Sequence, residues 1–183
     1  GNYLWHFSIG QGDSLSSFTI LQTDNENDLI IGGTFSGTVN FNPRGEARLV
    51  SAQGGRKDMF FAKYDAGGEL LWIHTVSNRS YLDSGSILNL SIDPENNVIV
   101  SGIVYGDGYI DDATTPDYPY LKGSTFIGKY SPEGRVIWTF DLGQPGTTVM
   151  ARALCSDSEG NIYLGIGFKG NLDVDPSEKV ELF

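Results

Sequence analysis

The stretch MFFAKYDAGGELLWIHTV, from Met59 to Val76, decides the fold of this chain because its central part occurs twice. FFAKYDAGGELLW returns as FIGKYSPEGRVIW, 66 positions further along (126 − 60). The identical positions are Phe60/Phe126, Lys63/Lys129, Tyr64/Tyr130, Gly68/Gly134 and Trp72/Trp138. Two apolar, aromatic-rich runs around a polar turn with glycine predict a β-hairpin. Its recurrence at a fixed spacing indicates a repeat protein.

A second unit occurs three times, and it also has the pattern of a hairpin. The copies are TDNENDLIIGGTF from Thr23, IDPENNVIVSGIV from Ile92 and SDSEGNIYLGIGF from Ser156. In each copy an apolar run leads into an aspartate, a tight turn and another apolar run. The aspartates suit the first turn position, where the carboxylate bonds its own backbone; they are Asp24, Asp93 and Asp157. Residues that tolerate positive φ follow them, namely Asn27, Asn96 and Gly160.

The two hairpins together give four strands in each repeat. In the first copy we predict strands at roughly 18–23, 28–35, 59–64 and 69–76. In the second copy we predict them at roughly 87–92, 97–104, 125–130 and 135–141. These strands are apolar at nearly every position, as expected of a sheet that is covered on both faces. Four-stranded sheets repeated radially are the blades of a β-propeller. The predicted fold is therefore all-β, with about two complete antiparallel blades and further partial ones.

We treat residues 1–183 as a single β-propeller-type domain of approximate repeats. These are 3–9 (an outer strand marked by Trp5), 16–76, 85–142 and a shortened copy at 148–183. Propellers typically close with about 4–8 blades, so we do not expect this chain to close a ring alone. Either it is a region of a longer protein, or several copies form a homo-oligomer that completes the blades.

Composition excludes some partners. The formal net charge is −11 and the pI is near 4.4, whereas nucleic acids and anionic membrane surfaces attract clustered Lys and Arg. No run approaches the roughly 18 apolar residues of a membrane span. The single cysteine, Cys155, excludes an internal disulfide. Because it lies next to an apolar run, we predict a buried, inert thiol.

Several residue clusters superficially suggest chemistry, but a structural role is favoured for each. Asp24, Glu26 and Asp28 lack the glycine and the bidentate glutamate of an EF-hand loop, so plain turn chemistry is preferred to a metal site. Asn40 and Asn42 are predicted to cap a loop, like their acidic counterparts Asp173 and Asp175. His6 and His74, without a nearby Cys or carboxylate motif, make a poor zinc site. We expect them to be packed or at the rim, and we predict no metal and no cofactor.

No catalytic constellation is found, so the chain is not predicted to be an enzyme. SPEGRVIW, from Ser131 to Trp138, resembles the Asp-box turn of sialidases, which is itself structural. Glu133 stands where the aspartate of that turn is expected. The arginines of the chain fall at differing repeat positions, so they do not predict the arginine cluster that a sialidase needs.

The segment from Tyr105 to Gly123, YGDGYIDDATTPDYPYLKG, departs from the repeat pattern. A segment that the repeat does not dictate is free to serve a partner, and tyrosines are good recognition residues. The candidate ligand-binding residues are Tyr105, Tyr109, Asp111, Asp112, Tyr118 and Tyr120. The alternative is an irregular insertion that packs on the rim of its own blade.

The quoted motifs also resemble a known family. GGTFSGTVNFNP from Gly32, SAQGG from Ser51 and DMFFAKYDAGGELLW from Asp58 are similar to the bacterial SBBP-type β-propeller repeats, over most of 18–176. The second repeat departs from the family pattern at 105–123. The resemblance implies a secreted, cell-surface or periplasmic propeller, usually a region of a larger protein and notably found in Bacteroidetes. It carries no common catalytic residues.

The sequence thus favours a non-catalytic secreted or surface module that binds a protein or a glycan. Two alternatives stay open. The blades are a structural spacer within a larger surface protein, or they are a fragment of a propeller enzyme, a glycosidase or lyase, whose active site lies in other blades.

Overall fold

The computed structural model describes residues 3, 5–10, 16–53, 57–78, 85–105, 107–111, 120–122, 125–143 and 147–172. Over these ranges the chain forms strands and turns. None of the described segments is a helix long and apolar enough to cross a membrane.

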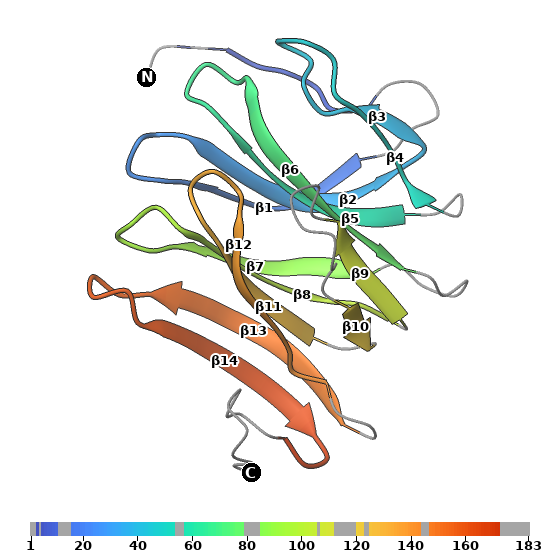
Figure 1. Cartoon of the computed structure of the whole chain (residues 1–183), viewed down its shortest axis with the longest axis vertical. Helices are drawn as coiled ribbons and strands as arrows, with labels where there is room; N and C mark the ends of the chain where they lie inside the picture. Colours follow the sequence, from blue (N-terminus) through green and yellow to red (C-terminus); the bar gives the residue numbers. More distant parts are fainter. Residues whose placement is uncertain are drawn as a thin grey trace.

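The strands form propeller-like antiparallel blades that lie one next to another along the chain (Figure 1). Blade 1 consists of β1 (Ser16–Thr23), β2 (Leu29–Ser36), β5 (Lys57–Tyr64) and β6 (Leu70–Asn78). Blade 2 consists of β7 (Ser86–Ile92), β8 (Val98–Ile103), β11 (Thr125–Tyr130) and β12 (Val136–Asp141). Blade 3 has the two strands β13 (Thr148–Ser156) and β14 (Ile162–Lys169). The eight strands predicted for blades 1 and 2 are confirmed to within two residues at each end.

Both faces of the inner strands of blade 1, β2 and β5, are covered, which explains why these strands do not alternate between apolar and polar residues. Successive side chains of β5 point to opposite faces of the sheet. Phe60, Ala62 and Tyr64 belong to one apolar core, while Met59 and Phe61 belong to the other, which lies between blades 1 and 2. Blade 2 therefore covers blade 1 as the stacked-blade prediction requires.

The repeated tryptophans join neighbouring blades. The Trp72 indole N–H on β6 donates to the backbone O of Pro132 in the β11–β12 turn, at 2.9 Å. Trp5 makes the same 2.9 Å bond to the backbone O of Ala66 in the β5–β6 turn. Each tryptophan therefore reaches the outer turn of the next blade along the chain. In the middle of each turn a glycine takes a positive φ, Gly68 at 85° and Gly134 at 83°.

The connections between second and third strands carry short hairpins. In the first repeat, β3 (Thr38–Asn40) pairs with β4 (Leu49–Ser51). In the second, β9 (Asp107–Asp111) pairs with β10 (Tyr120–Lys122), and β9 also pairs with β6 of the preceding blade. The described part of this insertion therefore pairs with the sheet of the preceding blade. The sheet of blade 1 is thereby extended to six strands, since β9 pairs with the edge of β6 and β10 pairs with β9.

Two expectations need correction. Residues 5–10 carry Trp5 in its predicted relation to the next blade, but they are not in strand conformation, because none of the described strands pairs with them and pairing is what forms a strand. Cys155 is exposed, not buried. The apolar run beside it belongs to blade 3, where β14 alternates between intermediate and exposed residues instead of being covered.

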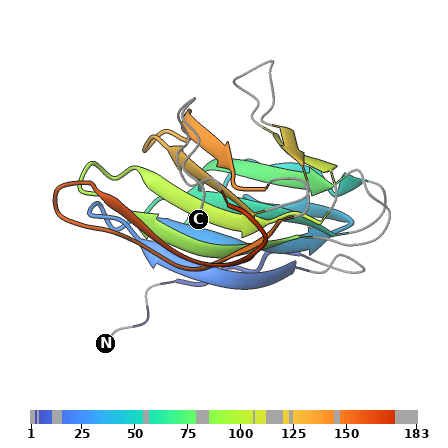
Figure 2. The same ribbon diagram turned by 90° about the horizontal axis from the view of Figure 1, so that it is seen from below.

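The turns that hold the repeated aspartates gather on one side of the molecule. The β1–β2, β7–β8 and β13–β14 turns all lie at the left in Figure 1, and the view from below keeps them together (Figure 2). A hydrogen bond from the backbone N of Asn25 to Oδ1 of Asn96 links the first two at 3.1 Å.

Candidate functional site

The aspartate turns have the geometry that the sequence predicted. Oδ1 of Asp24 accepts hydrogen bonds from the backbone N–H groups of Glu26 and Asp28, both at 2.9 Å. Asp93 and Asp157 make the equivalent pairs of bonds. Asn27 and Asn96 take positive φ angles of 66° and 62°. Turn chemistry therefore accounts for these acidic clusters, and Asn40 likewise caps its own loop through Oδ1.

The second carboxylate oxygen of the turn binds the repeated lysine, a role that the sequence analysis missed. Lys63 Nζ lies 2.8 Å from Oδ2 of Asp24 and 3.2 Å from Oδ2 of Asp28, and the Lys63 side chain is 2% exposed. Lys129 Nζ lies 2.7 Å from Oδ2 of Asp93. The sequence signal for this contact was that the lysine and the aspartate recur together in both complete repeats. The pair locks the third strand of each complete blade to the turn between its first two.

These contacts shift the pKa of the carboxyl groups. Burial raises the pKa of Asp24, but the hydrogen bonds from Lys63 and from the backbone of Asp28 and Glu26 outweigh it, so the net pKa is lowered. Asp93 has a lowered pKa for the same reason, with Lys129 and Asn97 as donors. Both aspartates are therefore held in the charged form that the lysines need.

Neither histidine has the surroundings of a metal ligand. His74 is buried, its ring stacks on Phe61 at 5.1 Å, and Nε2 lies 2.7 Å from the backbone O of Gly134. His6 contacts the hydroxyl of Tyr3. Within the described ranges no group of three or more His, Cys, Asp or Glu residues is arranged to hold a metal ion.

The candidate binding residues are only partly brought together. Tyr105 follows β8 and is 49% exposed, while Tyr109 lies in β9, where its backbone pairs with Ser77 of β6 and with Tyr120 of β10. Asp111 ends β9 opposite Thr75. Asp112 and Tyr118 lie outside the described residues. Three of the six candidates, Tyr109, Asp111 and Tyr120, thus lie on one hairpin at the outer edge of blade 1.

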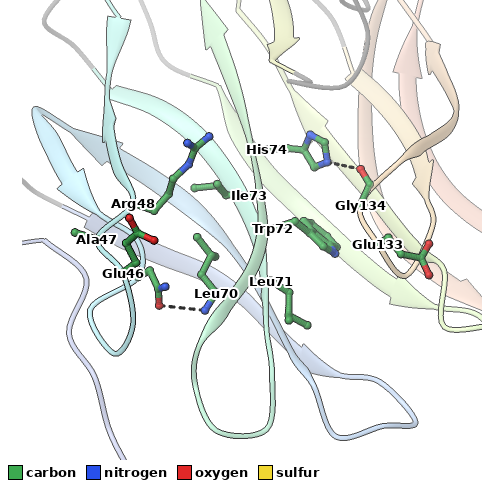
Figure 3. A pocket seen from close by; sticks show the side chains of 11 residues that line it. Glu46, Ala47, Arg48, Leu70, Leu71, Trp72, Ile73, His74, Glu133 and Gly134 are labelled. Atoms are coloured by element: carbon green, nitrogen blue, oxygen red, sulfur yellow. Dashed lines mark hydrogen bonds between the residues drawn. The ribbon is translucent and has the colours of Figure 1, made fainter.

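A groove of about 570 Å³ lies next to that hairpin, along the outer strand of blade 1 (Figure 3). Its floor is formed by five consecutive residues of β6, from Leu70 to His74. Alternate side chains of a strand point to opposite faces, so five consecutive lining residues place the groove along the edge of the strand. Among the described strands, β6 pairs on this side only with β9, and only from Thr75 to Asn78.

The walls of the groove come from two other segments. Glu46, Ala47 and Arg48 of the β3–β4 connection form one wall, and Glu133 and Gly134 of the β11–β12 turn form the other (Figure 3). The exposed Leu71 side chain supplies an apolar contact between them. Asn42 fixes the start of β6, since its Oδ1 accepts the backbone N–H of Leu70 at 3.2 Å. The sequence analysis missed this groove, because it needs three segments that are distant in the sequence.

Comparison with known proteins supports the repeat fold. The chain is 26% identical over 187 aligned residues to an uncharacterised WD repeat-containing protein of Acanthamoeba polyphaga mimivirus. The alignment covers 88% of this chain and 13% of that protein, so the chain spans a small part of the relative it matches. No family model matches the chain. A distant WD-repeat relative and the antiparallel blades of this all-β structure together support a propeller-like repeat fold.

Proposed function

We propose that this chain is a non-catalytic interaction module that binds a partner protein along the outer edge of blade 1. The observation that carries the proposal is the groove on β6, in which an edge strand is bordered by two walls. An unpaired strand edge is a template for an added strand. Extended peptides bind such edges through main-chain hydrogen bonds, and neighbouring side-chain pockets give specificity.

The chain itself supports this mode of binding. β9 already adds to the same edge of β6, immediately beyond the groove. An extended peptide lying beside Leu70–Ile73 would continue the line of β9. It would meet Leu71 and, on the walls, the charges of Glu46, Arg48 and Glu133. In this proposal Tyr109 on β9, and Tyr105 just before that strand, lengthen the contact.

Two parts of the proposal go beyond the fold. We place the protein outside the cytoplasm, secreted, on the cell surface or in the periplasm, because the motifs resemble SBBP-type repeats. We also prefer a protein to a glycan, because the groove offers an edge of backbone groups. Cell fractionation with an antibody tests the location.

A binding screen with a matched pair of variants tests the site. Random 12-residue peptides displayed on phage are selected on the wild-type chain, and a glycan array is probed in parallel. Leu71→Glu should weaken the selected peptides at least 10-fold. Ile137→Glu is the control, because Ile137 is the equivalent, equally exposed position of β12. Equal losses in both variants, or binding to glycans alone, would contradict the proposal.

A further inference from the structure

In the described residues, blade 3 has the same turn as the complete blades and no third strand beside it. β13 and β14 pair as β1–β2 and β7–β8 do. β2 and β8 each pair on their other edge with a lysine-bearing strand, β5 or β11. Among the described residues no strand pairs with that edge of β14. The sequence contains three aspartate turns and two copies of the lysine hairpin.

Asp157 keeps the geometry of a lysine site. Its Oδ1 accepts the backbone N–H groups of Glu159 and Asn161, as Oδ1 of Asp93 does in blade 2. Its Oδ2 accepts from the Asn161 amide at 2.9 Å, just as Oδ2 of Asp93 accepts from Asn97 at 2.9 Å. In blade 2 that same Oδ2 also binds Lys129 at 2.7 Å, whereas in blade 3 it accepts the hydroxyl of the exposed Tyr163 at 3.0 Å. The turn of blade 3 therefore keeps the carboxylate that pairs with a lysine in blade 2, with Tyr163 as its second donor.

A second, independent feature points to the same hairpin. Trp5 and Trp72 each donate an indole N–H to the turn of the next blade's outer hairpin. Trp138 is the third member of this series, on the outer strand of blade 2, and its ring stacks on Phe140. The equivalent acceptor would be a backbone carbonyl in the outer hairpin turn of blade 3. One ligand would serve both Asp157 and Trp138, namely a hairpin with a lysine in its first strand.

The exposed side chains of β14 agree with this requirement. Tyr163 and Phe168 are 55% and 44% exposed. Their repeat equivalents in the complete blades are almost entirely buried: Ile30 and Ile99 for Tyr163, and Phe35 and Val104 for Phe168. Blade 3 therefore exposes apolar positions that the repeat covers elsewhere.

We infer that the open edge of β14 is a binding site for a β-hairpin of the same repeat type as β5–β6 and β11–β12. The lysine of its first strand pairs with Asp157, and a carbonyl of its turn accepts the Trp138 indole N–H. The ligand is thus a segment with the pattern F-x-x-K-Y, a polar glycine turn and a second apolar strand.

A synthetic peptide tests the inference in trans. A fluorescein-labelled peptide with the sequence of residues 125–141 is titrated with the whole chain and followed by fluorescence anisotropy. We expect saturable binding, with slowed hydrogen exchange in residues 162–169. Asp157→Asn should weaken binding at least 10-fold, because the amide keeps the Oδ1 acceptor of the turn and removes the charge. Trp138→Phe should weaken it several-fold, whereas Trp5→Phe should leave it unchanged, since the Trp5 indole bonds Ala66.

A double-mutant cycle separates the pairing from a general loss of structure. The peptide with Met in place of its lysine should bind the wild-type chain at least 10-fold more weakly, and Asp157→Asn should then cause no further loss. The comparison of the two peptides uses the wild-type chain, so it stays valid even if the Asp157→Asn variant folds poorly. Absence of saturable binding, or equal affinity of the wild type and Asp157→Asn, would overturn the inference.

Discussion

The ammonium group of Lys63 lies between Asp24 and Asp28 with almost no access to solvent. Breaking a buried ion pair by removing one partner costs about 3–5 kcal/mol, because the other charge is left buried without compensation. Lys63→Met should therefore lower the free energy of unfolding by about that amount, measured by urea denaturation. Lys129→Met is the matched control. Lys129→Met leaves one carboxylate without its lysine, that of Asp93, and the Asn97 amide still bonds it at 2.9 Å. Lys63→Met leaves two carboxylates without their lysine, so the loss for Lys129→Met should be smaller. Equal losses would show that the second carboxylate does not set the difference.

Two buried carboxylates should give pH dependences of opposite sign. Burial raises the pKa of Asp58, and the hydrogen bonds from the Gln53 N–H and the Ser77 hydroxyl only partly offset it. The folded state therefore takes up a proton at Asp58 before the unfolded state does, at pH values above the unfolded pKa of about 3.8. As pH falls from 7 towards 4, the wild type should gain stability relative to Asp58→Asn.

Asp24 has the opposite behaviour, because its pKa is lowered in the folded state. Its stabilising contribution is complete above the unfolded pKa of about 3.8 and is lost as pH falls through the folded value. The wild type should therefore lose stability relative to Asp24→Asn below about pH 4. Urea midpoints for the three proteins at closely spaced pH values check both signs. If the stability of a variant and that of the wild type change in parallel with pH, the pKa shift given for that aspartate is contradicted.

At the scale of the element, the β11–β12 and β13–β14 turns each have a glycine at positive φ, but the two glycines are packed differently. Gly134 and Gly160 have nearly equal positive φ angles, 83° and 84°. A Cβ on Gly134 would lie 2.7 Å from the Trp72 ring, whereas a Cβ on Gly160 would meet nothing within 4 Å. Gly160→Ala should thus cost about 1–2 kcal/mol for the left-handed backbone alone. Gly134→Ala should cost about 1–3 kcal/mol more from overpacking, measured as the difference in unfolding free energy.

The elements themselves could be predicted from the sequence because their signals are local. An aspartate, a residue with positive φ and flanking apolar runs specify a hairpin without reference to the rest of the chain. The partner of β9 could not be predicted this way. Its pairing with β6 brings Tyr109 opposite Ser77, and main-chain hydrogen bonds between edges leave no residue signature.

Burial was less predictable than strand position, because it depends on the neighbouring blade. Cys155 lies in a segment with the same pattern as the covered strands, yet it is exposed. The lysine–aspartate pair and the groove on β6 were missed for a related reason. Both need contacts between segments that only the stacking of hairpins brings together.

At the scale of the whole molecule, the protection of backbone amides from hydrogen exchange should be highest between blades 1 and 2 and lowest in blade 3. Residues of β8 are buried throughout, and β8 is paired on both edges. β14 is paired on one edge, and many of its side chains are exposed. A two-stranded hairpin is marginally stable by itself, so blade 3 depends on the packing of β13 against β7.

We therefore expect backbone amides of Ile162–Lys169 to exchange hydrogen at least about 10-fold faster than those of Val98–Ile103, since local opening is easiest where few apolar contacts are lost. Hydrogen exchange followed by mass spectrometry, at two protein concentrations 10-fold apart, measures this. Rates that do not change with concentration are expected if blade 3 stays open in the monomer. If the amides of β14 exchange more slowly at the higher protein concentration, a second copy covers the edge. That result would favour the homo-oligomer that the sequence leaves open. Equal and concentration-independent protection of β8 and β14 would contradict the open edge itself.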